Sequence, residues 1–212
     1  MRVIPMNDIE KQAHWREVYS TKQPTEVSWF EQVPDISLQL IADTGLDHST
    51  SIIDIGGGTS LLVDCLLDKG YKNLSVLDIS QEALNIAKAR LGVRGNCVRW
   101  ISTDICNWKP EATSIDIWHD RATFHFLTDD ADRSRYITSM KMAVKKGAYV
   151  IIGTFALDGP EKCSGLQVRR YDPVTLAQTL GSDFSLLKFI RHSHTTPWGS
   201  HQSFQFSTFK RA

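Results

Sequence analysis

The chain has 212 residues, of which 42% are hydrophobic, so it is long enough to bury a substantial core and fits one α/β domain. Basic and acidic side chains each number 24, and this zero net charge argues against a polyanionic partner such as nucleic acid or an anionic membrane. The four cysteines form no C-x-x-C pair, which argues against a zinc ribbon or a disulfide framework and predicts free thiols in a reducing compartment.

The first fifty residues are expected to fold, because they are too rich in aromatic side chains for a linker. Asn7 or Asp8 can cap a first helix, and a second can open at Pro34. Trp29 lies in the segment between these two helices. We therefore predict a helical N-terminal segment over residues 1–50.

An apolar run followed by glycines, residues 52–60 (IIDIGGGTS), predicts a buried parallel strand that turns sharply into a helix. Glycine tolerates positive φ and carries no Cβ, so a ligand can lie directly against the backbone of such a turn. The dinucleotide pattern G-x-G-x-x-G is incomplete, because Leu61 occupies the place of the third glycine. Asp54 also places a negative charge where a pyrophosphate would be repelled. The turn therefore suits a ligand with an ammonium group, and a glycine turn of some other α/β protein is the alternative.

The next two predicted strands also lead into acidic residues. Residues 73–77 form an apolar run that ends at Asp78, and residues 97–101 lead to Asp104 and Ile105. An acid after the second strand of such a sheet can accept hydrogen bonds from both hydroxyls of a ribose. Each carboxylate alone could be a helix cap, but three acids that close three successive strands indicate a shared ligand at one sheet edge.

Together these features resemble class I S-adenosylmethionine (SAM) methyltransferases, whose cofactor has an amino-acid tail and no phosphate. The resemblance implies an α/β fold: a doubly wound, mostly parallel seven-stranded sheet with an antiparallel C-terminal strand, helices on both faces and an N-terminal helical lid. It implies SAM as cofactor and S-adenosylhomocysteine as product, with Asp104 accepting a hydrogen bond from the adenine amino group and Ile105 packed on the ring. The implied cofactor-binding residues are Trp29, Asp54, Gly56, Gly57, Gly58, Asp78, Ile79, Asp104, Ile105 and His119.

The fourth predicted strand runs into a segment that the resemblance places opposite the transferred methyl group. Residues 120–122 (DRA) resemble the Asp-Arg-Gly-Ala stretch of thiopurine and related thiol methyltransferases, and also the Asp-Lys-Gly-Thr of lysine methyltransferase-like proteins. Ala122 stands where both patterns have glycine. The Asn/Asp-Pro-Pro-Tyr pattern of DNA amino-group methyltransferases is absent, which disfavours that substrate class. The candidate catalytic residues are Asp120 and His119, with His125 as a further proton acceptor.

The end of the chain predicts the reversed strand of that fold. The last two predicted strands are separated by a short turn at residues 197–199, and strands joined so closely pair antiparallel. The polar residues 158–166 follow the fifth strand at the ligand-binding edge, where we expect acceptor contacts. The predicted strands of this half cover residues 114–118, 148–155, 184–192 and 203–209, with a helix at 173–180.

Two further groups of reactive side chains are expected to be structural. His192 and His194 form one short H-x-H pattern without a matching cysteine or carboxylate, so we predict no metal site. Cys163 has no paired histidine beside it in the sequence, and methyl transfer from a sulfonium needs no enzyme nucleophile.

The predicted activity is methyl transfer from SAM to a small-molecule nucleophile, with a thiol as one candidate. A protein lysine N-methyltransferase and a SAM-binding module without catalysis are the alternatives, and a nicotinamide oxidoreductase is disfavoured by the missing glycine. The expected partner is a small-molecule or protein acceptor, with no nucleic acid and no membrane. We expect one domain over residues 1–212 with a Rossmann-like core at 51–212, and a cytoplasmic location because no apolar run has the length of a signal peptide or a membrane span.

Overall fold

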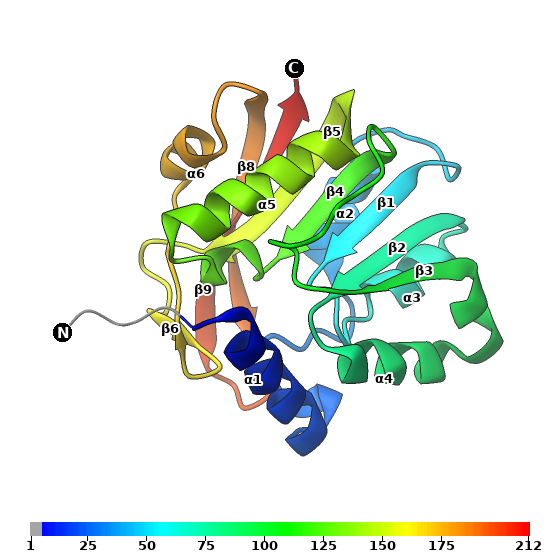
Figure 1. Cartoon of the computed structure of the whole chain (residues 1–212), viewed down its shortest axis with the longest axis vertical. Helices are drawn as coiled ribbons and strands as arrows, with labels where there is room; N and C mark the ends of the chain where they lie inside the picture. Colours follow the sequence, from blue (N-terminus) through cyan, green and yellow to red (C-terminus); the bar gives the residue numbers. More distant parts are fainter. Residues whose placement is uncertain (1–5) are drawn as a thin grey trace.

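The computed structural model describes residues 6–212 and centres on a seven-stranded sheet with helices on both faces (Figure 1). The strands of this sheet are β1 (Ser51–Ile55), β2 (Asn73–Asp78), β3 (Val98–Ser102), β4 (Ile115–Arg121), β5 (Val144–Phe155), β8 (Phe184–Thr195) and β9 (His201–Arg211). A separate two-stranded ladder joins β6 (Lys162–Cys163) to β7 (Leu166–Gln167). The α-helices are α1 (Asp8–Thr21), α2 (Asp35–Ala42), α3 (Leu62–Asp68), α4 (Gln81–Leu91), α5 (Asp130–Ala143) and α6 (Pro173–Leu180), and the 3-10 helices are η1 (Pro24–Glu26), η2 (Gly92–Cys97) and η3 (Phe124–Phe126).

The strand order is β3-β2-β1-β4-β5-β9-β8. The first five strands along the chain pair in parallel, whereas β9 runs antiparallel to both β5 and β8. One strand is therefore reversed relative to all the others. This arrangement confirms the predicted doubly wound, mostly parallel sheet with an antiparallel C-terminal strand.

Alternate residues of the central strands face two separate hydrophobic cores, because successive side chains of a strand point to opposite faces of the sheet. Ile53 and Ile55 of β1 pack in the core beneath α5 and α6, whereas Ile52 packs in the core beneath α2, α3 and α4. Both cores are buried, and both faces of the sheet are covered. Ligand access is thereby confined to the ends of the strands.

Strand β4 is longer than the sequence predicted, and this difference matters for the site. The apolar pattern stops at Trp118, but the strand continues to Arg121, with His119 opposite Asp54 of β1 and Asp120 opposite Ile55. Both His119 and Asp120 are therefore strand residues whose side chains point into the two faces of the sheet. The strand β5 is also longer than expected and begins at Val144, where two lysines and a glycine obscure the pattern.

The N-terminal segment contains the two predicted helices. Asn7 caps α1 through a capping box, since its side chain accepts from the Glu10 amide at 3.0 Å and its amide donates to the Glu10 carboxylate at 2.8 Å. Helix α2 follows Pro34 as expected. None of the helices in residues 6–212 has both the length and the apolar character needed to cross a membrane.

Candidate cofactor site and active site

A cavity of about 440 Å³ lies at the carboxyl ends of the first four strands, a volume in the range of small-molecule sites. Helix α1 and the β6–β7 ladder supply further lining residues. Strand-end residues on the cavity wall are Gly56, Asp78, Ile79, Asp104, Ile105, Arg121, Ala122 and Thr123. The structure thus brings together the residues that follow β1, β2, β3 and β4, as the sequence predicted for a shared ligand.

The glycine turn after β1 has the form that a closely bound ligand requires. Gly56 and Gly58 have φ of +66° and +46°, in the left-handed region that favours glycine. A Cβ atom on Gly58 would lie 2.7 Å from the hydroxyl oxygen of Tyr19 and 3.0 Å from Oδ2 of Asp78, and one on Gly57 would lie 2.6 Å from Oδ2 of Asp54. Side chains are therefore excluded here, because neighbouring groups of the protein pack directly against the backbone of the turn.

Asp78 is 5% exposed and lies at the wall of the cavity. Its Oδ1 accepts a hydrogen bond from the amide of Ser80 at 2.8 Å. Burial, with the nearby charge of Asp54, raises the pKa of Asp78 to about 7. A buried carboxylate with spare acceptor capacity suits a ligand that brings paired hydroxyl donors, such as a ribose.

One carboxylate oxygen of Asp104 is buried without a hydrogen-bond partner in the described part of the chain. Its Oδ1 accepts from the amide of Cys106 at 2.8 Å, while Oδ2 is buried and has no hydrogen-bond partner within residues 6–212. The nearest cation is the ammonium of Lys11, 4.0 Å from Oδ2. Ile105, which is 5% exposed, lies beside it on the cavity wall. An unsatisfied acceptor next to an apolar surface fits an adenine ring with its amino group.

A second cavity of about 30 Å³ adjoins the first, and Trp29, Gly56 and Arg121 line both. Asp54 and His119 lie on the wall of this smaller cavity. Its position beside the glycine turn suits a small charged group, such as the tail of an amino acid.

His119 does not reach the larger cavity. Its Nδ1 lies 2.7 Å from Oδ1 of Asp54, and its Nε2 lies 2.8 Å from the hydroxyl oxygen of Ser37 on α2. The side chain is only 2% exposed, and both ring nitrogens are engaged. No nitrogen of His119 is free to take a proton from an acceptor, so the expected catalytic role is corrected. His119 instead holds the carboxylate of Asp54.

Asp120 lies on the opposite face of β4, fully buried under α5, and lines neither cavity. Its carboxylate accepts from the hydroxyl of Tyr136 at 2.6 Å and from the amides of Thr123 and Phe124 at 2.9 and 3.1 Å. Burial raises its pKa to about 6. Asp120 is therefore not placed as the predicted catalytic residue: its acceptors are used within the protein, and it positions the turn after β4.

The turn that Asp120 holds does form part of the cavity wall. Ala122 in this turn has φ of +66°. The two family patterns that this segment resembles have glycine at the same place, and the left-handed conformation explains that preference.

The other reactive side chains that the sequence singled out are buried and poorly suited to chemistry. His125 packs between the rings of Phe126 and Phe155, and burial lowers its pKa to about 3, so it is neutral at physiological pH. Burial raises the pKa of Cys163 to about 11, which leaves almost no thiolate. Neither lines the larger cavity.

Four aromatic side chains, which we call the aromatic cluster, form the wall on the side of α1. Their ring centroids are 5.0 to 6.4 Å apart in the contacting pairs, mostly edge to face. The members are Trp15, Tyr19, Trp29 and Phe126, and all line the cavity. Trp29, predicted as a lid contact, thus lies at the site.

Lys11 and Arg121 belong to the site but were not predicted as ligand contacts. The ammonium of Lys11 lies 2.6 Å from the carboxylate of Asp132, which ties α1 to the first turn of α5 across the cavity. Arg121 donates to the carbonyl of Trp29 at 2.8 Å. Both cations join segments that are distant in the chain, so no local pattern could have identified them.

Comparison with known proteins gives a match to one family and to one curated relative. Residues 52–147 match the family described as a methyltransferase domain. A curated relative, EEF1A lysine methyltransferase 2 of Danio rerio, is 24% identical over 149 residues, which cover 66% of this chain and 64% of the relative. The chain thus spans less than two thirds of that relative's length.

Two solved structures share the fold. A SAM-dependent methyltransferase of Anabaena variabilis superposes with a TM-score of 0.75 over 100% of both chains at 12% identity. The 1,6-didemethyltoxoflavin-N1-methyltransferase of Burkholderia thailandensis, solved with 1,6-didemethyltoxoflavin and S-adenosylhomocysteine, gives a TM-score of 0.69 at 18% identity, covering 100% of this chain and 93% of that one. These comparisons confirm the resemblance to class I methyltransferases.

Proposed function

We propose, from the premise that residues 52–147 form a methyltransferase domain with SAM as its cofactor, that this protein transfers a methyl group from SAM to a small-molecule nucleophile. One observation carries the proposal: Gly56 of the glycine turn, the buried Asp78, and Asp104, whose Oδ2 is buried without a hydrogen-bond partner, line one cavity of about 440 Å³. The donors and apolar surface of SAM match these groups one by one.

In this proposal the cofactor lies across the strand ends. Asp78 accepts from the ribose hydroxyls with Ile79 beside it, and Asp104 accepts from the adenine amino group with Ile105 against the ring. The amino-acid tail lies against Gly56, Gly57 and Gly58, with its ammonium near Asp54 in the smaller cavity. When bound, SAM supplies an electrophilic methyl group on a sulfonium.

The protein's own contribution is then to orient the acceptor and to exclude water. No histidine lines the larger cavity within residues 6–212. Of its other carboxylates, Asp132 is paired with Lys11 and Arg135, and Asp129 caps α5 through Oδ1. We infer that an acceptor that arrives already deprotonated, such as a thiolate or an unprotonated ring nitrogen, is favoured over an ammonium.

A protein lysine is the second candidate acceptor, favoured by the curated relative, whose printed name is that of a lysine methyltransferase. A lysine ammonium would have to lose its proton before transfer, which demands a base or a desolvating entry to the cavity. A SAM-binding module without catalysis is the third candidate.

Binding and transfer can be tested separately. Calorimetry with SAM and with S-adenosylhomocysteine should give binding that Asp78→Asn weakens at least tenfold, whereas Asp183→Asn, at an exposed acid just before β8, should bind like wild type. Absence of binding to both ligands would overturn the cofactor assignment.

The acceptor class follows from SAM labelled in its methyl group and incubated with cell extract. Label in low-mass material supports the proposal, and label confined to protein favours the lysine alternative. Binding of SAM without transfer to either fraction favours the non-catalytic module.

A further inference from the structure

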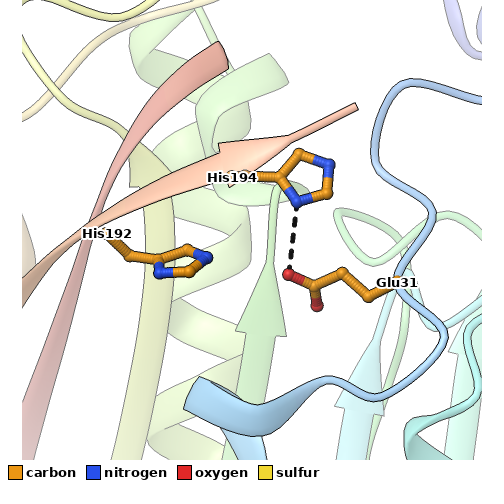
Figure 2. Close-up of side chains that lie close together, drawn as sticks. All are labelled: Glu31, His192 and His194. Atoms are coloured by element: carbon orange, nitrogen blue, oxygen red, sulfur yellow. Dashed lines mark ion pairs between the residues drawn. The ribbon is translucent and has the colours of Figure 1, made fainter. Parts of the chain in front are cut away.

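The segment after η1 and the strand β8 bring together three side chains that the sequence does not connect. Figure 2 shows the carboxylate of Glu31 facing the imidazoles of His192 and His194. One ligand atom from each of the three lies within 4.8 Å of the other two. His192 and His194 project from the same face of β8, since they are two residues apart in a strand. The sequence predicted no metal site because this pair lacked a third ligand, and the fold supplies one.

The hydrogen bond of His194 to the backbone orients its other nitrogen toward Glu31. Nε2 lies 2.7 Å from the carbonyl oxygen of Ser28, and a carbonyl can only accept, so Nε2 carries the hydrogen. In the neutral ring Nδ1 then presents a lone pair to Oε1 of Glu31, 3.4 Å away. Two acceptors at this distance attract each other only through a shared proton or a metal ion. A histidine whose second nitrogen donates to a carbonyl is also the common arrangement of metal ligands.

The distance between these two atoms agrees with tetrahedral coordination. Zinc binds histidine nitrogen and carboxylate oxygen at about 2.0–2.2 Å, which places neighbouring ligand atoms of a tetrahedron about 3.3 Å apart. His194 and Glu31 already have this separation. His192 is half-buried, and its ligand atom lies within 4.8 Å of those of Glu31 and His194, so a side-chain rotation is needed to bring it into the same sphere. Two imidazoles and one carboxylate suit zinc better than magnesium or calcium.

One neighbouring cation has to be accommodated. A guanidinium nitrogen of Arg121 lies 3.0 Å from Oε1 of Glu31, and Arg121 is also held by its bond to the carbonyl of Trp29. Nδ1 of His194 faces the same oxygen, so an ion bound at Oε1 requires the guanidinium of Arg121 to move to Oε2 of Glu31.

We propose that Glu31, His192 and His194 bind a divalent zinc-type ion, with a fourth position open to water. The ion joins residues 28–31, which include Trp29 of the aromatic cluster, to β8. It thereby fastens the N-terminal segment over the cavity. This role is structural and does not depend on the proposed methyl transfer.

The test uses the full chain, freed of metal by a chelator and dialysed, and then titrated with zinc chloride. We expect one ion per chain at micromolar or tighter affinity, at least tenfold weaker in Glu31→Gln and His192→Gln. His201→Ala, at an exposed histidine of the same hairpin, and Cys97→Ser, at an exposed cysteine, should bind like wild type. Cobalt(II) should give the visible absorption of a four-coordinate nitrogen and oxygen site, without a thiolate charge-transfer band.

His194→Ala removes a buried side chain, so its folding must be checked by circular dichroism, and the two glutamine variants carry the test if it unfolds. No zinc binding at micromolar concentration would overturn the proposal. Binding that persists in both glutamine variants, or that is lost in Cys97→Ser, would also overturn it.

Discussion

The imidazole of His119 and the carboxylate of Asp54 form a buried pair across two parallel strands, with Nδ1 2.7 Å from Oδ1. The two residues lie directly opposite each other in the register of β1 and β4. Ser37 holds the second nitrogen of the ring at 2.8 Å. His119 therefore sets the direction of the Asp54 carboxylate at the smaller cavity. His119 itself lines only this cavity of about 30 Å³, which is too small for a substrate.

His119→Ala should weaken SAM binding about tenfold, equivalent to about 1.4 kcal/mol, with little change in kcat at saturating SAM. The reason is that His119 positions Asp54 and has no free nitrogen for proton transfer. Calorimetry gives the Kd and steady-state kinetics give kcat. His119→Gln, whose amide can still donate to Asp54, should recover part of the affinity. A large loss of kcat at unchanged Kd would restore a catalytic role.

Asp78→Asn should make the protein more stable while it loses cofactor binding. The folded-state pKa of Asp78 is about 7 against an ordinary 3.8, so the folded state holds more protons between these values. The free energy of unfolding of the wild type then falls as pH rises from 3.8 to about 7. The asparagine variant has no carboxyl group at this position, so its free energy of unfolding does not fall for this reason. We expect a gain of about 1–3 kcal/mol at pH 8 and a smaller gain at pH 5, measured by denaturant unfolding. Equal stability of the two proteins at pH 8 would contradict the burial argument.

Binding of SAM should tighten as pH rises through about 7. Only the ionised form of Asp78 can accept hydrogen bonds from both ribose hydroxyls, and burial holds the pKa of this group in the free protein at about 7. Calorimetric titrations from pH 5.5 to 8.5 should therefore show affinity increasing to a plateau at the alkaline end. Asp78→Asn is the control and should give a flat, weak profile. A wild-type profile without slope would show that Asp78 is not the titrating contact.

Asp120→Ala should lose stability and turnover together. The substitution leaves the Tyr136 hydroxyl and the amides of Thr123 and Phe124 without an acceptor in a buried position, at a cost of about 2–4 kcal/mol. Tyr136→Phe removes one of these bonds, together with the bond that the Trp118 indole donates to the Tyr136 hydroxyl at 2.8 Å, and should cost about 1–3 kcal/mol. Thermal unfolding and kcat measured on the same samples provide the comparison. Turnover lost at wild-type stability would make Asp120 catalytic after all.

Ala122→Gly should stabilise the protein by about 1 kcal/mol. The alanine has φ of +66°, and this left-handed conformation costs about 1–2 kcal/mol for a residue with a Cβ, partly offset by the greater entropy of glycine in the unfolded chain. Ala177→Gly, at a half-buried alanine within helix α6, is the matched control and should destabilise. Denaturant unfolding of the two variants should therefore change in opposite directions.

Much of the fold and the cofactor side of the site could be predicted from the sequence, because their signals are local. The glycine turn with Asp54, and the acids Asp78 and Asp104, each lie next to an apolar run that marks a buried strand. Parallel strands bring such ends to one edge without any further information. The reversed β9 was likewise indicated by the short turn between the last two strands.

The chemistry of the segment after Trp118 could not be predicted in the same way. A histidine and an aspartate end the apolar pattern, so the sequence indicates a loop, yet the strand continues and each side chain finds partners on a helix far along the chain. Ser37 of α2 holds His119, and Tyr136 of α5 holds Asp120. Glu31 meets His194 in the same manner. Such contacts exist only once the layers have assembled.

The placement of β9 between β5 and β8 has a consequence for the order in which the molecule assembles. β8 precedes β9 along the chain and pairs with no other strand of the sheet. It can therefore join the sheet only when residues 201–211 are present. Until those residues arrive, the edge of β5 presents unpaired amides and carbonyls, and its neighbouring face is strongly apolar. The pairing of β5 with β9 joins distant parts of the chain, and long-range strand pairing is in general slow and leaves strand edges exposed to aggregation until it is complete.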